Sequence, residues 1–139
     1  MHILGIGIAT IDVIHTVADF PSEDTKIRAL QQFIRRGGNA TNTLVILSQL
    51  GHQCSWGGVC VDESNGLLIL QDVEAHHIDT SYCRIESEGH VPTSHISLNQ
   101  RTGSRTVIHY RHTPEFKFDD FQQISLSRVD WLHFDLKGD

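Results

Sequence analysis

Apolar and polar positions follow different periods along the first half of the chain. Residues 2–10 form an almost continuous apolar run that ends near Asp12, a pattern typical of a buried strand. Residues 40–51 repeat their apolar positions every three to four residues, which predicts a helix. Residues 54–62 then indicate a second strand and residues 63–78 a second helix. Strand and helix in alternation predict an α/β fold with a parallel sheet and helical crossovers.

Each of the two predicted helices has one apolar face. The first helix has a natural end at Gly51, because glycine readily takes the left-handed conformation that terminates many helices. Its apolar face is formed by Ala40, Leu44 and Leu47. The predicted apolar face of the second helix is formed by Leu67, Leu70, Val73 and His77. We expect each helix to pack this face on the sheet.

The polar turn PSED, residues 21–24, separates two segments that read as extended, 13–20 and 25–36. Together they predict a two-stranded ribbon that projects from the body and needs a partner to cover its apolar face. A helix over residues 26–36 is the alternative, because RALQQFI contains good helix formers.

Short β-segments replace the strand–helix alternation after Tyr82. The stretches CRIE, PTSHISLNQ and SRTVIHYR, joined by the turns SEGH and QRTGS, predict an antiparallel meander. The stretch SRVDWLHFDL near the end of the sequence predicts one more apolar strand.

Length, charge and cysteine usage narrow the class of protein. The chain has 139 residues, the size of one domain, and a formal net charge of −6, which argues against binding to nucleic acids or anionic membranes. It has no apolar run of roughly 18 residues, as a membrane-spanning helix needs. The cysteines form no CxxC pair, which indicates reduced thiols in the cytoplasm. The ten histidines show no ligand spacing, so we expect no metal site.

The stretch RRGGNATN, residues 35–42, has two glycines and two asparagines at the start of the first helix. A plain turn needs one glycine at most, so Gly37 and Gly38 indicate that the backbone approaches a ligand closely. Asn39 and Asn42 lie three residues apart on one helical face, and their amides offer donors and acceptors that suit vicinal hydroxyls. Simple capping of the helix by Asn39 is the alternative.

Asp12 is expected at the end of the first strand, where open α/β sheets bind their ligands. A carboxylate there accepts hydrogen bonds from two neighbouring hydroxyls, whereas the alternative is a surface aspartate at the start of the ribbon. With the glycine–asparagine turn, Asp12 predicts a site for a small, uncharged, hydroxyl-rich ligand. Arg105 has the chemistry to bind a phosphate through two hydrogen bonds, and an exposed charge on a strand is the alternative.

Four stretches taken together resemble the N-terminal half of the PfkB/ribokinase-type carbohydrate kinases, and among them the ketohexokinases. These stretches are GIATIDVI, PSEDTKIRAL, RRGGNATNTLVILSQLG and TGSRTVIHYR. The resemblance covers most of the chain and implies that residues 1–139 are the N-terminal part of a ribokinase-like kinase domain. The implied architecture is a partial, doubly wound, mainly parallel sheet with helices on its faces. A small β-sheet lid, the β-clasp, would comprise segments at about 12–36 and 91–112.

The resemblance also implies roles for individual residues. The sugar contacts of the family fall on Asp12, Gly38, Asn39 and Asn42. Asp24 matches the acidic lid tip that reaches the sugar of a partner subunit, which implies a homodimer formed through the β-clasp. Arg105 matches an arginine near the nucleotide phosphates. Asp135 and Lys137 match an acidic and a basic residue that line the cleft.

The implied activity is the ATP- and Mg²⁺-dependent phosphorylation of a hydroxyl of a ketohexose such as fructose. The family's catalytic base lies in a C-terminal GxGD motif followed by a helix, and here Leu136 stands where that motif needs its first glycine. We therefore expect the nucleotide-binding half and the base to be absent from these residues, and this chain alone to be inactive. The alternatives are a non-catalytic sugar-binding or dimerisation module, and a nucleoside kinase of the same superfamily.

Overall fold

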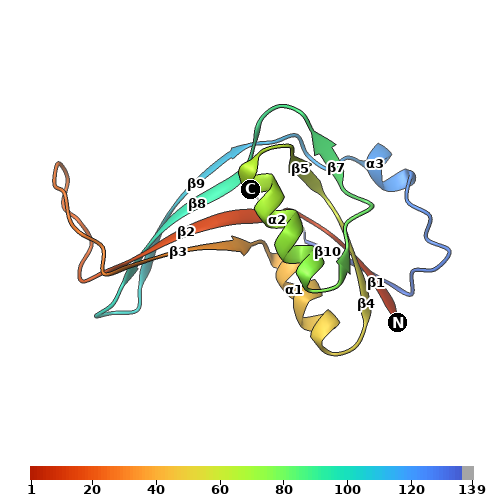
Figure 1. Cartoon of the computed structure of the whole chain (residues 1–139), viewed down its shortest axis with the longest axis horizontal. Coiled ribbons are helices and arrows are strands. Elements are labelled where there is room, and N and C mark those ends of the chain that lie inside the picture. Colours follow the sequence, from red (N-terminus) through yellow and green to blue (C-terminus); the bar gives the residue numbers. More distant parts are fainter. Residues whose placement is uncertain (136–139) are drawn as a thin grey trace.

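The body of the protein is built on a parallel sheet. The computed structural model describes residues 1–135, and its element arrangement is shown in Figure 1. The body sheet has the order β10-β1-β4-β6, and each neighbouring pair is parallel. Its strands are β1 (His2–Ile6), β4 (Gln53–Gly57), β6 (Ile78–Asp79) and β10 (Trp131–Phe134). The mainly parallel α/β architecture expected from the alternating periods is confirmed.

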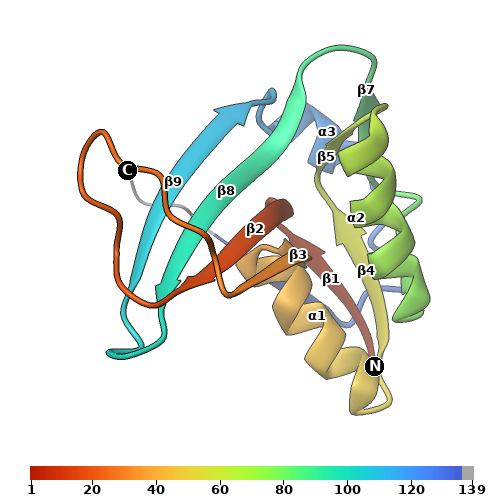
Figure 2. The ribbon, with the colours of Figure 1, turned by 60° about the vertical axis from the view of Figure 1, so that its left-hand side comes forward.

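A second sheet projects from this body, and we call it the lid after the resemblance described above. It has the order β3-β2-β8-β9, in which β2 and β8 are parallel and the two outer pairs are antiparallel. Figures 1 and 2 show its four long strands side by side, reaching away from the helices. Its strands are β2 (Thr10–Val17), β3 (Gln31–Gly37), β8 (His90–Asn99) and β9 (Arg105–His112). The alternative helix over residues 26–36 does not form.

The first apolar run divides between the two sheets. The strand β1 ends at Ile6 and β2 begins at Thr10, so Asp12 is a residue of the lid sheet and does not end the first strand as predicted. The chain turns at Gly7, where a side chain would collide with Ala40 of the first helix. This close approach lets the run leave the body sheet and continue into the lid.

Two further strand predictions are corrected. Residues 54–62 form two short strands, β4 and β5 (Val59–Val61), with Gly58 between them. A Cβ on Gly58 would lie 2.7 Å from both the Gly7 carbonyl oxygen and the Trp56 ring. The stretch CRIE is no part of a meander: β7 (Arg84–Glu86) pairs in parallel with β5 as a separate two-stranded sheet. The hydrogen-bonding partners of such short segments depend on the fold around them, which local sequence does not encode.

The helices α1 (Asn39–Gln49) and α2 (Ser64–Ala75) lie where they were predicted, with α1 against β1 and β4 and α2 against β5 and β6. The buried face of α2 differs from the prediction. Val73 is buried as predicted, but Leu67 is 56% exposed and His77 is also exposed, while Gly66 and Ile69 are buried. Gly66 is buried because the helix backbone approaches Val61 too closely for any side chain. A short helix α3 (Phe118–Gln122) was not predicted.

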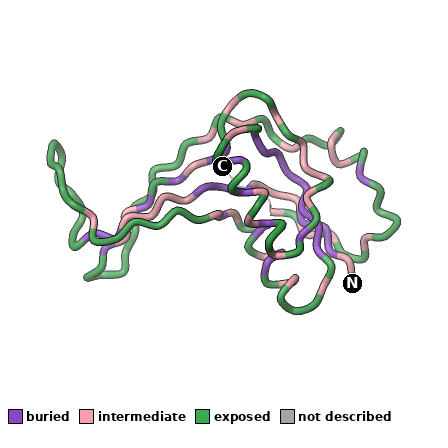
Figure 3. Tube along the Cα trace, in the orientation of Figure 1, coloured by how far each residue is buried: buried purple, intermediate pink, exposed green. Residues whose placement is uncertain are grey.

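Burial is concentrated in the body. Figure 3 shows buried residues along the body strands and exposed ones along much of the outer lid strands. The largest fully buried side chains include Trp56, Leu4 and Leu44. Trp56 and Leu44 belong to the main core cluster together with Ile69 and Val73 of α2, whereas Leu4 alternates to the other face of the body sheet. Across residues 1–135, no helix has both the length and the apolar composition that a membrane crossing requires.

Candidate functional site

A cleft with a volume of about 940 Å³ opens where the body meets the base of the lid. Its wall comes mainly from the segment after β1, the start of α1, the segment 113–121 and the end of β10, with single residues from β5, β8 and β9. The wall combines apolar residues such as Phe116 and Phe134 with a few polar groups, a mixture typical of small-molecule sites. The cleft therefore lies at the carboxyl ends of β1 and β10, where α/β sheets bind ligands.

The glycine–asparagine turn supplies one wall of this cleft. Gly38 has a φ of 110° and precedes the first helical residue, and any side chain on it would overlap the Ile8 carbonyl oxygen. Asn39 is the first residue of α1, and α1 has no side-chain cap. The capping alternative for Asn39 is therefore wrong. Gly38 and Asn39 both line the cleft, so the backbone N–H groups at the start of α1 lie beside it.

Asp12 lies immediately beyond the cleft wall on β2. Thr10, which lines the cleft, donates a hydrogen bond from Oγ1 to Asp12 Oδ1 at 2.9 Å. Residues two apart on a strand share a face, so the Asp12 carboxylate is on the same face as Thr10. Gly37 leaves room for that carboxylate, because a side chain at position 37 would run into it.

Asn42 is held by an arginine that the sequence analysis did not single out. Arg36 Nη1 donates to Asn42 Oδ1 at 2.9 Å and to Thr41 Oγ1 at 2.7 Å. Its Nε donates to Asp72 Oδ2 of α2 at 2.6 Å. One guanidinium thus connects the lid strand β3, the first turn of α1 and the helix α2. The stretch RRGG was the available signal, but it did not show which arginine points inward.

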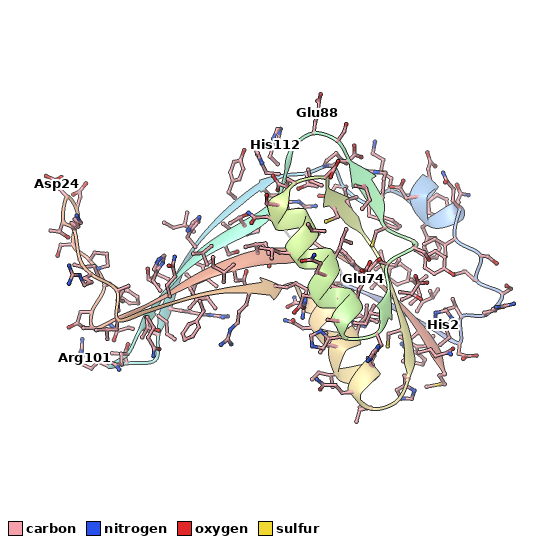
Figure 4. The ribbon with its side chains drawn as sticks, in the orientation of Figure 1. His2, Asp24, Glu74, Glu88, Arg101 and His112 are labelled. Atoms are coloured by element: carbon pink, nitrogen blue, oxygen red, sulfur yellow. The ribbon has the colours of Figure 1, made fainter. Side chains whose placement is uncertain are left out.

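Asn42, like Asp12, is not among the residues that line the cleft. The remaining two predicted residues also lie outside it in a single chain. Asp24 is exposed at the tip of the β2–β3 loop with a φ of 54°, and Figure 4 shows it at the far end of the lid. Arg105 is exposed and pairs with Leu98, four residues beyond Ser94, which pairs with Asp12. Four residues of strand correspond to about 13 Å, so Arg105 lies well outside the row of Asp12.

Several cleft residues were missed or given little weight. Arg111 lines the cleft with its side chain 19% exposed, and its Nη2 forms a 2.9 Å ion pair with Glu115 Oε2. Asp135, considered only through the resemblance, also lines the cleft, and its N–H donates to the Ile6 carbonyl at 2.9 Å. Lys137 falls outside the described residues. The cleft wall therefore carries both cationic and anionic side chains, among them Arg111, Glu115 and Asp135.

Comparisons with known proteins identify the family of this chain. A model of the pfkB family of carbohydrate kinases matches residues 2–135. The chain is 34% identical over 134 residues to ketohexokinase of Mus musculus, and the match covers 96% of this chain and 45% of that protein. The chain thus spans about half the length of this relative.

Solved structures share the fold. The nucleoside kinase of Methanocaldococcus jannaschii, a ribokinase-family member, matches with a TM-score of 0.76 and 17% identity, over 96% of this chain and 44% of that one. The Arabidopsis thaliana ribokinase complexed with ribose and ATP matches with a TM-score of 0.73 and 19% identity, over 86% and 41%. From the family match and the architecture together, this chain belongs to the pfkB family of carbohydrate kinases.

Proposed function

We propose that the full-length protein transfers the γ-phosphoryl group of ATP to a hydroxyl of a ketohexose such as fructose. In this proposal the present chain supplies the sugar-binding half. The observation that carries it is the cleft formed by Gly38 and Asn39 beside the Asp12 carboxylate. The identity to a ketohexokinase supports a ketose as the substrate.

The chemistry of these groups suits a neutral polyol. An ionised Asp12 accepts hydrogen bonds from hydroxyls, and amides such as those of Asn39 and Asn42 both donate and accept. Gly38 removes the side chain that would keep the ligand from the backbone at the start of α1. Rate enhancement in phosphoryl transfer comes largely from positioning and from stabilisation of the charge on the transferring group. Holding the acceptor sugar is the share of this work that we assign to the present chain.

ATP and Mg²⁺ are part of the proposal for the full-length protein. Mg²⁺ is commonly held by one or two carboxylates together with substrate phosphates. Within residues 1–135, no three histidine, cysteine or acidic side chains gather as ligands, while two carboxylates, Glu115 and Asp135, lie on the cleft wall and Glu115 is paired with Arg111. These residues would supply only part of the ligands of such a Mg²⁺ site. Bound Mg²⁺ would neutralise the charge of the ATP phosphates. Arg105 lies outside the cleft in a single chain, so in this proposal it approaches those phosphates after a movement of the lid or from a partner subunit.

We assign the catalytic base to a GxGD motif outside residues 1–139, and this chain alone is expected to be inactive. The supporting consideration is that the chain spans 45% of the mouse ketohexokinase. A cytoplasmic location belongs to the same proposal, since ATP and reduced cysteines are found there.

We also propose a homodimer formed through the lid. Four apolar side chains of the lid are exposed on a projecting sheet, namely Phe33, Ile34, Val107 and Ile108. A solvent-exposed sheet with apolar groups on both faces favours association. In such a dimer the tip residue Asp24 would reach the sugar of the partner subunit.

Calorimetry with fructose, ribose and adenosine tests the sugar-binding half directly. We expect fructose to bind wild-type protein, and Asp12→Ala to lose this binding with an unchanged circular dichroism spectrum. Tighter binding of adenosine would favour the nucleoside kinase. Binding of fructose without turnover by the full-length protein would favour the non-catalytic module.

Enzyme kinetics test the remaining parts. We expect the full-length protein to consume ATP with fructose and the 139-residue chain to show no turnover above buffer. Asp24→Ala in the full-length protein should raise the fructose KM, with its neighbour Glu23→Ala as the matched control. An unchanged KM would remove Asp24 from the site.

A further inference from the structure

The Arg36 guanidinium is almost fully enclosed at the junction of three elements. Its side chain is 7% exposed, and its three short hydrogen bonds go to Asp72, Thr41 and Asn42. The charge is balanced by the Asp72 carboxylate at 2.6 Å. A buried cation held in this way has one favourable orientation, because each broken bond leaves part of its charge unpaired.

Arg36 lies on the face of the lid sheet opposite to the one that carries Asp12. Asp12 pairs with Arg35 across the β2–β3 ladder, so the next side chain, that of Arg36, leaves the sheet on the opposite face. Arg36 is therefore on the face away from the Asp12 carboxylate. Any effect it has on a ligand beside Asp12 passes through the first turn of α1.

The chemistry of arginine determines how the Asn42 amide is turned. A guanidinium has only donors, so the Asn42 atom that Arg36 contacts is the carbonyl oxygen Oδ1. The amide nitrogen Nδ2 then points away from Arg36. Asn42 is exposed, so Nδ2 is the group that the residue presents to solvent or to a ligand.

We propose that Arg36 is a positioning residue that makes Asn42 a hydrogen-bond donor to the sugar. The inference rests on the proposed function, and it adds which protein group donates and which accepts each hydrogen bond to the sugar. Asp12 accepts a hydrogen bond from one sugar hydroxyl, while Asn42 Nδ2 donates to the oxygen of another. A ligand must therefore offer a donor and an acceptor at two defined places, which neighbouring hydroxyls do.

A double-mutant cycle in the full-length protein tests this coupling. Arg36→Met should raise the sugar KM about tenfold while the kcat and the ATP KM change less than about twofold. In the Asn42→Ala background, Arg36→Met should add less than about twofold, because the residue through which it acts is gone. Independent, multiplying effects of the two substitutions would overturn the proposal.

Two further variants separate positioning from general stability. Asn42→Asp keeps an acceptor for Arg36 but has no donor, so it should raise the sugar KM as much as Asn42→Ala. Normal sugar affinity of this variant would exclude the donor role. Asp72→Asn leaves the Arg36–Asn42 bond in place and should lower the melting temperature with a sugar KM within about twofold of wild type. An equal loss of sugar affinity in Asp72→Asn would contradict a specific role of Arg36.

A spectroscopic measurement distinguishes failure of this inference from failure of the proposed function. If the full-length protein phosphorylates no sugar, the proposed function fails, but the orientation of Asn42 is still measurable. Side-chain amide resonances of Asn42 in ¹H–¹⁵N spectra should shift in Arg36→Met, while those of Asn39 stay in place. Unchanged Asn42 resonances would overturn the inference whatever the activity.

Discussion

Gly37 lies diagonally across the β2–β3 ladder from Asp12, so close that any side chain on Gly37 would run into the Asp12 carboxylate. The same added Cβ would lie 2.6 Å from Thr10 Oγ1, the group that donates a hydrogen bond to Asp12. The first glycine of the turn, Gly37, therefore leaves space for the carboxylate of the candidate acceptor Asp12. The second, Gly38, lets the backbone before α1 pack closely where it lines the cleft.

We predict that Gly37→Ala displaces the Asp12 side chain and weakens sugar binding at least about tenfold, because the carboxylate loses both its position and its Thr10 bond. Calorimetry with fructose measures this effect. The matched control is Gly103→Ala in the β8–β9 turn, where φ is 72° and no atom lies within 4 Å of an added Cβ. That variant should cost about 1 kcal/mol of stability from backbone strain and leave sugar affinity unchanged.

Gly66→Ala should destabilise the protein by about 3 kcal/mol, measured by urea unfolding. The added Cβ would overlap the Val61 carbonyl oxygen, so α2 must move away from β5. The adjacent Leu67→Ala is the control, since Leu67 is 56% exposed, and its cost should stay below about 1 kcal/mol. Similar losses for both variants would refute this account of α2 packing.

Glu63 joins the start of α2 to the lid, and its pKa determines a pH dependence. Burial disfavours the ionised carboxylate, but hydrogen bonds from His90 Nδ1 at 2.8 Å and the Val91 N–H at 2.9 Å outweigh it, so the pKa of Glu63 lies below its usual value. A lowered pKa means that the ionised group stabilises the folded state above the pKa of the unfolded chain, about 4.3. This contribution is lost as the pH falls through the folded-state pKa.

Accordingly, Glu63→Gln should lower the free energy of unfolding by about 1 kcal/mol at pH 7. The difference from wild type should shrink as the pH falls through the lowered folded-state pKa of Glu63, below which the wild-type carboxyl also becomes neutral. Denaturant titrations at several pH values measure it. Glu88→Gln, an exposed neighbour in the same connection to β8, is the control and should show no such trend. A difference independent of pH would contradict the assignment to ionised Glu63.

The lid dimer predicts an effect of charge on an exposed apolar row. Ile34 and Ile108 are 58% and 71% exposed, and both lie in the row of lid residues that contains Val13. Ile108→Glu should convert a dimer to a monomer, seen by analytical ultracentrifugation, because a buried unpaired carboxylate costs several kcal/mol. Thr106→Glu, on the same strand and face but without an apolar side chain, is the comparison. A dimer that tolerates Ile108→Glu would exclude this face from the interface.

Local sequence pattern was sufficient for much of the fold. The helical period and Gly51 placed α1, and the alternating segments on either side of PSED placed two lid strands, because backbone periodicity is visible in a short window. The pattern failed at α2, where Leu67 was assigned to the buried face. The buried face of a helix depends on how closely its backbone can approach the neighbouring element. In α2 the closest approach is at Gly66, which packs on Val61 of β5.

For the candidate site too, local sequence pattern identified some residues, and the tertiary structure was needed to identify the others. Gly38 and Asn39 could be identified from composition, since two glycines before a helix exceed what a turn needs, and the structure places both on the cleft wall. Arg36 could not be distinguished from Arg35, because strand parity decides which of them faces α2. Arg111 and Asp135 likewise became cleft residues only through the arrangement of their strands.

The amino-acid sequence by itself determined the positions of α1 and α2, the glycine–asparagine turn and the family resemblance, because these depend on residue types at short spacing. The tertiary structure alone decided that Thr10 and Gly37 shape the surroundings of Asp12, that Arg36 orients Asn42, and that the lid exposes both its faces. The position of Gly37 beside Asp12 and the exposure of the lid depend on the pairing of strands that are distant in sequence, and the strand parity within β3 turns Arg36 towards Asn42.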